Sequence, residues 1–471
     1  MFGLESSLAF LLIFCLLAAV AFEFINGFHD TANAVATVIY TNSLKPQTAV
    51  IWSGMWNFIG VNVGGIAVAM GIVNLLPTEA LIDQNIYHSI SMIMALILTA
   101  IIWNLGTWYF GIPCSSSHTL IGSIFGVGIA YMLLPGNQTI ALNWAKVSEV
   151  GLSLLISPIF GFGLALLFMY LLRLFIRNRT LFKEAEPGTK PPMWVRAILV
   201  LTCTSVSFSH GSNDGQKGVG LIMIILIGIV PARFAIDQTQ KPERLLLSTQ
   251  NIEQLVHKID STELLKNDIK TLKLVNVKID TLKKLVNNLT KFDNSAAKTN
   301  FELRRDIILI AKKTEGILKN YDKKPLKSIT SAEITSLKKE IKTIKTFTEY
   351  SPWWVILMVS LSLGFGTMVG WKRIVVTIGE KIGKSHLTYA QGASAELIAA
   401  STIAVSTWFG LPVSTTHVLS SGVAGSMVAE NGFKNLQSKT IKNIGIAWLI
   451  TLPVTILLSG ILFLTFRLIF A

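Results

Sequence analysis

A polar stretch, Gly27-Phe28-His29-Asp30-Thr31-Ala32-Asn33-Ala34, directly follows an apolar run that extends from Leu8 to Ile25. Ionisable side chains at the end of a membrane-length apolar run are unfavourable, and such residues usually line a cavity or an ion path. The stretch has a second copy 184 positions later, Gly211-Ser212-Asn213-Asp214-Gly215-Gln216-Lys217-Gly218, in which glycine aligns with glycine and aspartate with aspartate. We therefore expect a membrane protein whose polar site is assembled from two related halves.

The composition predicts an all-α polytopic membrane protein that lies in the lipid bilayer. Of the 471 residues, 51% are hydrophobic and 14% are charged, whereas soluble domains carry about 25% charged residues. Apolar runs of about 18 residues or more recur along the chain, as bilayer-spanning helices require. The net charge of +14 does not indicate nucleic-acid binding, because 23 of the 41 lysines and arginines lie within residues 237–350 and the others mostly flank apolar runs.

A second pair of motifs also follows apolar runs. Gly111-Ile112-Pro113-Cys114-Ser115-Ser116-Ser117-His118 and Gly410-Leu411-Pro412-Val413-Ser414-Thr415-Thr416-His417 share their glycine, proline, first serine and histidine, 299 positions apart. This offset exceeds that of the aspartate motifs by 115, close to the 114 residues of the block 237–350. Removing the block brings the halves into register, so we predict a duplicated membrane unit that carries one inserted domain.

The predicted organisation has five parts. They are membrane repeat 1 (1–175), a cytoplasmic linker (176–193), the first part of membrane repeat 2 (194–236), a cytoplasmic helical insert (237–350) and the second part of repeat 2 (351–471). The linker 77–87 lacks lysine and arginine, whereas its counterpart contains Lys372, Arg373, Lys381 and Lys384. Because positive loops stay on the cytoplasmic side, equivalent loops lie on opposite faces, and the two repeats are predicted to be inverted.

Helices are expected to break at the polar motifs. We predict that the first apolar segment breaks at the Gly27 motif, and that the stretches 49–76 and 351–370 double back if each aspartate motif forms the tip of a hairpin. In the insert, apolar residues recur at spacings of three and four, which predicts soluble amphipathic helices. These residues are Leu265, Ile269, Leu272, Val275, Ile279, Leu282, Val286 and Leu289, followed by Ile334, Leu337, Ile341 and Ile344.

The proline-serine motifs are candidates for an anion site. Proline is favoured in the first turn of a helix and serine or threonine at the cap, so Pro113 and Pro412 are each predicted to start a half-helix within the membrane. A helix start presents unpaired N–H groups and a positive dipole end, and two facing starts would suit a small oxyanion. The alternative is ordinary capping. The hydroxyls concerned belong to Ser115, Ser116, Ser117, Ser414, Thr415 and Thr416.

The aspartate motifs are candidates for ion coupling. Asp30 and Asp214 can bind a cation or carry a proton, Asn33 and Asn213 can contact either ion, and Lys217 can contact the anion. The alternative is that Asp214 and Lys217 form a structural ion pair. His29, His118, His210 and His417 flank the four motifs, and each is either a candidate proton relay or a neutral hydrogen-bonded histidine. No histidine or cysteine spacing in the sequence indicates a zinc site.

Glu396 is a further coupling-ion candidate, because it lies inside an apolar segment. Its counterpart at the 299 offset is Ile97, so the two halves differ in charge here. The alternative is a snorkelling or paired structural carboxylate.

The four motifs resemble those of the inorganic phosphate transporter (PiT) family. The family pattern Gly-Ala-Asn-Asp-Val-Ala-Asn-Ala is similar to residues 27–34 and 211–218, and its Pro-x-Ser-x-Thr-His pattern is similar to residues 113–118 and 412–417. The resemblance implies phosphate as substrate, a coupling cation and a homodimeric transporter with re-entrant hairpins. It also implies that the serine, threonine, aspartate and asparagine residues of the motifs surround the substrate and the coupling ion.

Three departures from the family pattern bear on the coupling ion. His29 replaces an asparagine, and Gln216-Lys217 replaces Ala-Asn. Together with Ile97, these changes remove oxygens that could bind sodium. The pattern resembles that of bacterial low-affinity members, which use protons and accept phosphate complexed with Mg²⁺ or another divalent metal as co-substrate, and which lie in the inner membrane.

The sequence thus predicts a secondary transporter that imports phosphate, driven by protons, without a bound cofactor. The alternatives are a sodium-coupled phosphate symporter, a transporter of sulfate or another oxyanion, and a membrane enzyme acting on lipid phosphates. Both pairs of motifs are symmetric, whereas general acid–base catalysis needs residues with distinct roles, so an enzyme is not expected.

Overall fold

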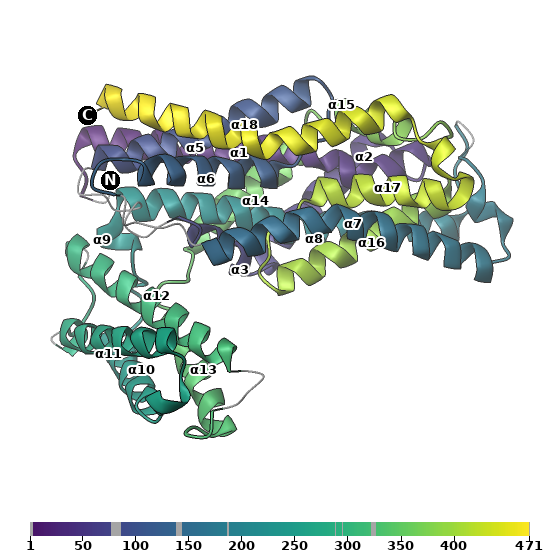
Figure 1. Cartoon of the computed structure of the whole chain (residues 1–471). Helices are drawn as coiled ribbons and strands as arrows, with labels where there is room; N and C mark the ends of the chain where they lie inside the picture. Colours follow the sequence, from purple (N-terminus) through teal and green to yellow (C-terminus); the bar gives the residue numbers. More distant parts are fainter. Residues whose placement is uncertain are drawn as a thin grey trace. The chain divides into compact units, whose positions relative to one another are not determined.

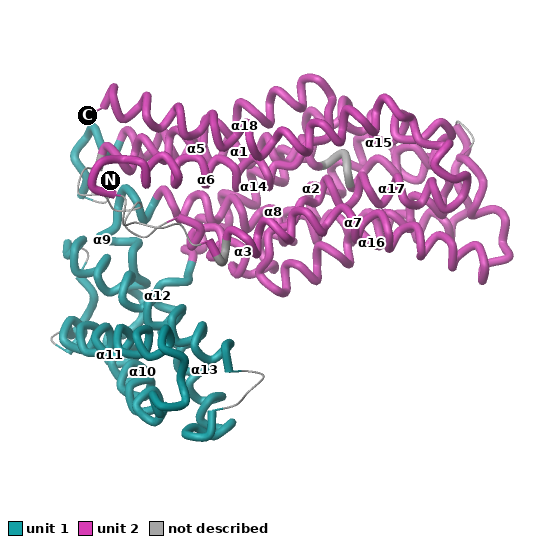
Figure 2. Tube along the Cα trace, in the orientation of Figure 1, with its two compact units in different colours: residues 1–9, 226–350 teal, residues 10–225, 351–471 magenta. Residues whose placement is uncertain are grey.

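The computed structural model describes residues 3–76, 86–137, 144–185, 188–287, 289–293, 295–321 and 326–470, except the side chains of residues 31–33, 86, 145 and 146. Within these ranges the chain is largely helical and holds no β-strand, only two isolated bridges. It divides into two compact units, residues 10–225 with 351–471 and residues 226–350 with 1–9 (Figure 2). The predicted all-α fold is confirmed.

The larger unit contains the apolar helices labelled in Figure 1. They are α1 (Ser6–Tyr40), α2 (Pro46–Val63), α3 (Ala67–Val73), α5 (Ile86–Tyr109), α6 (Ser116–Met132), α7 (Trp144–Phe175), α8 (Met193–Ile229), α14 (Trp353–Thr367), α15 (Lys372–Glu380), α16 (Tyr389–Trp408), α17 (Thr415–Asn431) and α18 (Ser438–Phe470), with short 3₁₀ turns η1 (Arg179–Phe182) and η3 (Phe433–Asn435).

Length and composition identify the membrane spans. Among the described residues, α1, α5, α7 and α18 are long and apolar enough to cross a bilayer, and there are up to six spans if the bent pairs α2–α3 and α14–α15 each count as one. Apolar side chains on α7 and α18, among them Leu155, Ile159, Leu457 and Ile461, are more than half exposed. An apolar surface of this kind is stable in lipid rather than in water. The chain is therefore an integral membrane protein.

The aspartate motifs do not break their helices, so that prediction is wrong. α1 is continuous from Ser6 to Tyr40 and α8 from Met193 to Ile229, and both motifs lie inside them. The breaks lie elsewhere, where α2 and α3 meet at 73° and α14 and α15 at 62°. Gly65 and Gly370 have positive φ angles of 76° and 70° at these breaks, a conformation that glycine adopts without strain. The stretches 49–76 and 351–370, which are predicted to double back, therefore contain or adjoin these bends.

The motif glycines serve close helix packing instead. A Cβ atom on Gly27 would lie 2.5 Å from the carbonyl oxygen of Leu363 in α14, and one on Gly366 would overlap the backbone of Phe24 in α1. Gly211 of α8 faces the backbone of Asn57 in α2 in the same way. Small residues allow membrane helices to approach this closely, so α1 packs on α14 and α8 packs on α2 backbone to backbone.

Replacing Gly27 with alanine is expected to destabilise the protein by about 1–3 kcal/mol, because overpacking a tight contact forces the backbones apart. The control is Gly163→Ala in α7, where an added Cβ meets nothing within 4 Å. Cys15, Cys114 and Cys203 are free and buried, so a thiol-reactive dye reports unfolding in detergent. Equal melting temperatures for the two variants would contradict this role of Gly27.

The smaller unit is a helical bundle with its own core. It contains α9 (Pro231–Phe234), α10 (Pro242–Val256), α11 (Lys266–Asn287), α12 (Ala297–Asn320), α13 (Ser331–Lys345) and the 3₁₀ turn η2 (Ser261–Glu263). The periodic residues predicted to form helices lie largely in α11 and α13, and most face a shared apolar core that includes Leu272, Ile279 and Leu337. Leu265 is an exception, since it precedes α11 and is 67% exposed. The predicted helices of the insert are thus confirmed.

A buried arginine joins the two ends of this bundle. Arg304 in α12 donates to the carbonyl oxygens of Ala235 (3.1 Å) and Thr348 (2.9 Å), and the N–H of Asp237 donates to Phe347 O (2.7 Å). Burial lowers the pKa of Arg304 to about 10, so the guanidinium stays charged at neutral pH. The segments at which the chain enters and leaves the bundle therefore lie side by side.

Candidate functional site

The two proline-serine motifs form equivalent helix starts. α6 begins at Ser116 and α17 at Thr415, and the preceding residues Ser115 and Ser414 are their N-caps. Each cap hydroxyl accepts a hydrogen bond of 3.1 Å from the backbone N–H three residues later. The prediction that the prolines begin these helices is wrong, because each proline lies two residues before the cap, in the approach to the helix. The serine takes the capping position because its side chain can accept from an N–H group that has no intrahelical partner.

The two helix starts touch each other inside the protein. The hydroxyl of Ser117 donates to the carbonyl oxygen of Val413 (2.8 Å), and the rings of His118 and His417 lie 4.5 Å apart. The cap residues and the next two residues of both helices are buried. Ser115 and Ser414 serve as caps, and the hydroxyls of Ser116, Ser117, Thr415 and Thr416 follow them in the first turns of the two helices.

Asp30 is held by hydroxyls from both helix starts. Ser116 of α6 donates to its Oδ2 (2.9 Å), and Thr416 of α17 donates to its Oδ1. The Asp30 side chain is 1% exposed. A carboxylate is an oxyanion, and hydrogen bonds to it are about twice as strong as neutral ones. The two half-helices therefore form a donor set that binds an oxyanion buried in the membrane unit.

Asp214 pairs with Lys217 one turn along α8. The Lys217 Nζ atom lies 2.7 Å from Asp214 Oδ1, donates to Val413 O at 3.0 Å and also donates to Ser117 Oγ. The sequence-based alternative of an ion pair is thus present. Lys217 also binds both helix starts, so the pair belongs to the same site as Asp30. Ser116 and Thr415 hydroxyls lie 3.5 Å from the second Asp214 oxygen.

His29 links Asp30 to α5. Its Nδ1 lies 3.2 Å from Asp30 Oδ1, and its Nε2 lies 3.2 Å from the hydroxyl of Thr107. In the other half, Asn213 Nδ2 donates to Thr407 (2.9 Å) and Leu411 O (3.2 Å). The amide of Asn213 therefore positions the segment before α17.

His210, which directly precedes the second aspartate motif, also belongs to the site. Its Nε2 lies 3.6 Å from Asp214 Oδ2 and 3.9 Å from Asp30 Oδ2, and its Nδ1 lies 2.9 Å from Asn57 Oδ1. The sequence signal is its position four residues before Asp214, on the same face of α8. The buried Asn57 in an apolar helix is a similar signal.

The carboxylates and His210 can hold a divalent cation. One ligand atom from each of Asp30, His210 and Asp214 lies within 4.8 Å of the others. The Nε2 atom of His210 is buried and has no hydrogen-bond partner in the described part of the chain. Two carboxylates and an imidazole are common ligands for divalent metals, so these residues fit a divalent metal ion.

The other predicted residues lie apart from this site. Glu396 of α16 is fully buried and accepts a hydrogen bond from Thr202 of α8 (2.6 Å). Thr202 precedes Asp214 by twelve residues, or about 18 Å along the helix. Glu396 is therefore a buried carboxylate that is hydrogen-bonded to Thr202 rather than a snorkelling one, and it lies outside the cluster around Asp30 and Asp214. Asn33 is within α1, but its side chain lies outside the described residues.

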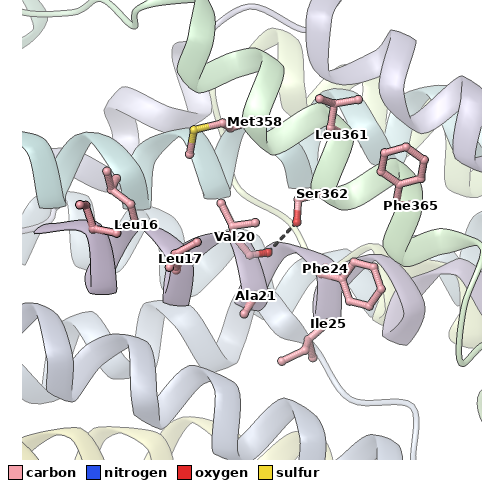
Figure 3. Close-up of a pocket in the computed structure, with 11 residues that line it drawn as sticks. Leu16, Leu17, Val20, Ala21, Phe24, Ile25, Met358, Leu361, Ser362 and Phe365 are labelled. Carbon is pink, nitrogen blue, oxygen red and sulfur yellow. Dashed lines mark hydrogen bonds between the residues drawn. The ribbon is translucent and has the colours of Figure 1, made fainter. Parts of the chain in front are cut away.

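A surface groove between α1 and α14 is unsuited to an anion. It has a volume of about 960 Å³ and is lined by apolar residues such as Leu16, Val20 and Phe365 (Figure 3). The hydroxyl of Ser362, also in the lining, already donates to the carbonyl oxygen of Val20. The polar site between the helix starts is therefore the candidate for substrate binding.

Comparison with known proteins agrees with this geometry. Residues 26–459 match the phosphate transporter family. The chain is 41% identical to the low-affinity inorganic phosphate transporter of Buchnera aphidicola subsp. Acyrthosiphon pisum, over 98% of this chain and 96% of the relative. It is 39% identical to the low-affinity inorganic phosphate transporter PitA of Escherichia coli, over 97% of each.

A solved structure shares the fold. The chain named "The sodium-dependent phosphate transporter" is 18% identical, with a TM-score of 0.54, and the match covers 98% of this chain and 99% of that one. The membrane helices, the family match and the nearly full-length relatives agree. The chain belongs to the phosphate transporter family and is a transporter, not an enzyme.

Proposed function

We propose that the chain is a secondary active transporter that imports inorganic phosphate with protons, by alternating access of two inverted halves. The observation that carries the proposal is that the Asp30 carboxylate is bound by hydroxyls from α6 and α17 together. Donors that hold a carboxylate in this way can hold a phosphate oxygen, and Lys217 supplies a cation beside them. Substrate contacts are assigned to Asp30, Ser116, Ser117, Lys217 and Thr416, together with Asp214 and Thr415.

The charge of the site argues for cation coupling. The carboxylates of Asp30 and Asp214 and the ammonium group of Lys217 together give the site a formal charge of −1 when its histidines are neutral. Adding a phosphate anion to this buried site would place several negative charges together, which is strongly unfavourable at low dielectric. Phosphate is therefore expected to arrive with a neutralising cation, which is either a proton or a divalent metal such as Mg²⁺.

The same argument supports a metal–phosphate complex as substrate. A divalent cation with hydrogen phosphate is neutral and adds no charge to the site. The atoms of Asp30, His210 and Asp214 are close enough together to share such a cation. Sodium coupling is the competing proposal, since a sodium ion could neutralise the same carboxylates.

Further parts of the proposal follow from the family resemblance and the charge pattern. We place the protein in the bacterial inner membrane as a homodimer, with the insert 237–350 on the cytoplasmic side. Lysine and arginine are frequent in this block and in the linker 176–193, as expected on that side. Protease accessibility in right-side-out vesicles tests the orientation, and an insert that is cleaved from outside would contradict it.

The test is phosphate uptake into proteoliposomes under an imposed pH gradient or an imposed sodium gradient. We expect uptake to follow the pH gradient and to increase with Mg²⁺. Uptake driven only by sodium would overturn proton coupling, and no uptake under either gradient would overturn the transport proposal. Competition by unlabelled arsenate but not by sulfate is expected, and strong inhibition by sulfate would instead favour a general oxyanion transporter.

A further inference from the structure

Glu23 is a buried acid that the phosphate site does not use. It lies in α1, is 0% exposed and precedes Asp30 by seven residues. One carboxyl oxygen accepts a hydrogen bond from Asn26 Nδ2 (3.3 Å). The other oxygen, Oε1, and the Oδ1 atom of Asn26 are buried and have no hydrogen-bond partner among the residues described. Two unpartnered buried oxygens on neighbouring turns are unusual and call for a ligand or a proton.

The surrounding helix is shaped around the carboxyl group. A Cβ atom on Gly218 of α8 would lie 2.6 Å from Glu23 Oε1 and 2.5 Å from its Cγ. Any side chain at position 218 would therefore displace the carboxyl group. Gly218 follows Lys217 directly, so Glu23 contacts α8 at the residue next to the proposed phosphate site.

Among the described residues, no cation lies within hydrogen-bond distance of Glu23. The charged groups that act on it are Asp214 and Asp30, which are acidic, and Lys217, which is paired with Asp214. Glu23 takes part in none of the ion pairs found in the described part of the chain. An unpaired carboxylate at this depth would be strongly unfavourable. Only two free oxygens are available, too few to replace the hydration shell of a metal ion, whereas a proton needs one.

Glu23 also has a defined place along α1 relative to Asp30. Residues seven apart lie on the same face of a helix, so Glu23, Asp30 and Thr37 form one stripe on α1, with about 10 Å between successive members. At the far end of the stripe, Thr37 packs on Gly392, one turn before Glu396. Two buried acids, Glu23 and Glu396, thus lie on opposite sides of Asp30.

We propose that Glu23 carries a coupling proton, on the side of the phosphate site opposite Glu396. This inference rests on the proposed proton-coupled transport of phosphate. In the loading step, Glu23 Oε1 takes a proton from a hydronium ion and a water molecule is left. In the release step, the O–H bond breaks and the proton returns to water. Protonated Glu23 carries no charge, so no unpaired charge is buried. Its O–H group can donate to Asn26 Oδ1.

The experiment compares wild type, Glu23→Gln and the control Glu149→Gln, an exposed acid in α7, in proteoliposomes. Phosphate–phosphate exchange without a gradient measures binding and conformational change, and a trapped pH dye measures protons moved per phosphate. We expect Glu23→Gln to keep exchange and to lose phosphate-dependent acidification. Accumulation of phosphate should fall about tenfold per unit of pH gradient for each proton lost from the cycle. Glu149→Gln should match wild type.

An unchanged ratio of protons to phosphate in Glu23→Gln would overturn the proposal. If this variant loses exchange as well, Glu23→Asp decides: recovered exchange with a shifted pH dependence supports proton binding, and no recovery shows a purely structural role. If wild type itself moves no protons, the proposed function fails instead. A sodium-dependent uptake that Glu23→Gln abolishes would assign Glu23 to sodium and contradict the proton.

Discussion

Replacing Asp30 with asparagine is expected to reduce the initial rate of phosphate uptake by ~100-fold. The substitution keeps the shape of the side chain and removes its negative charge. The bonds from Ser116 and Thr416 then become neutral, and each loses on the order of 1–2 kcal/mol, which together corresponds to about a hundredfold. Without the charge, the site also attracts the accompanying cation less strongly.

Uptake of radiolabelled phosphate by proteoliposomes measures this effect, with Asp280→Asn in the exposed face of α11 as the matched control. Asp214→Asn is expected to impair uptake as well, with a different pH profile, because His29 contacts Asp30 whereas Lys217 pairs with Asp214. Wild-type uptake by Asp30→Asn would rule out its role, and identical pH profiles would argue against the asymmetry of the two aspartates.

Replacing Lys217 with glutamine is expected to destabilise the protein by about 3–5 kcal/mol and to abolish uptake. The substitution leaves the Asp214 carboxylate buried without its cation. Removing one partner of a buried ion pair typically destabilises a protein by about 3–5 kcal/mol. The double variant Lys217→Gln with Asp214→Asn removes both charges. It should regain most of the stability but not the transport.

The melting temperature reported by the three buried cysteines and the rate of uptake separate these two effects. If Lys217→Gln melts at the wild-type temperature, the ion pair of Asp214 and Lys217 is not needed for folding. A double variant that transports at the wild-type rate would show that Lys217 does not contact phosphate. Lys217→Arg provides the charge-conserving comparison, since the longer planar guanidinium fits a pocket shaped for an ammonium poorly.

The sequence predicts which residues meet, because the motifs are duplicated. Asp30, Ser116, Asp214 and Thr416 come from four distant segments, and all lie in one cluster in the structure. Their spacing matches once the block 237–350 is removed, so each half positions its motifs in a similar way. The helices of the insert are also predicted well, since an amphipathic pattern depends on local periodicity alone.

Helix continuity at the motifs could not be predicted from local sequence. A polar segment within an apolar helix looks like a break, but Asp30 stays helical because hydroxyls from α6 and α17 satisfy its carboxylate. Those hydroxyls come from residues 116 and 416, far along the chain. Glu23 is not identified from the sequence for a related reason. Its burial depends on packing against Gly218, a residue that lies 195 positions further along the chain.

Gln216 shows how a departure from the family pattern can be structural. Its side chain donates to Gly64 O and Ser212 O (both 2.7 Å) and accepts from Val68 N (2.8 Å). The bonds with Gly64 and Val68 satisfy backbone groups that are freed where α2 and α3 bend, and the bond to Ser212 O anchors the side chain to its own helix. The residue therefore stabilises the bend rather than the ion site.

The arginine that joins the ends of the helical bundle makes this protein convenient to label. Because Arg304 holds Ala235 next to Thr348, the distance that a replacement must bridge is short. A compact reporter whose own termini are close, such as a fluorescent or epitope-bearing domain, could take the place of residues 237–350 without pulling α8 away from α14. Such a chimera would allow the transporter to be counted and followed in living cells.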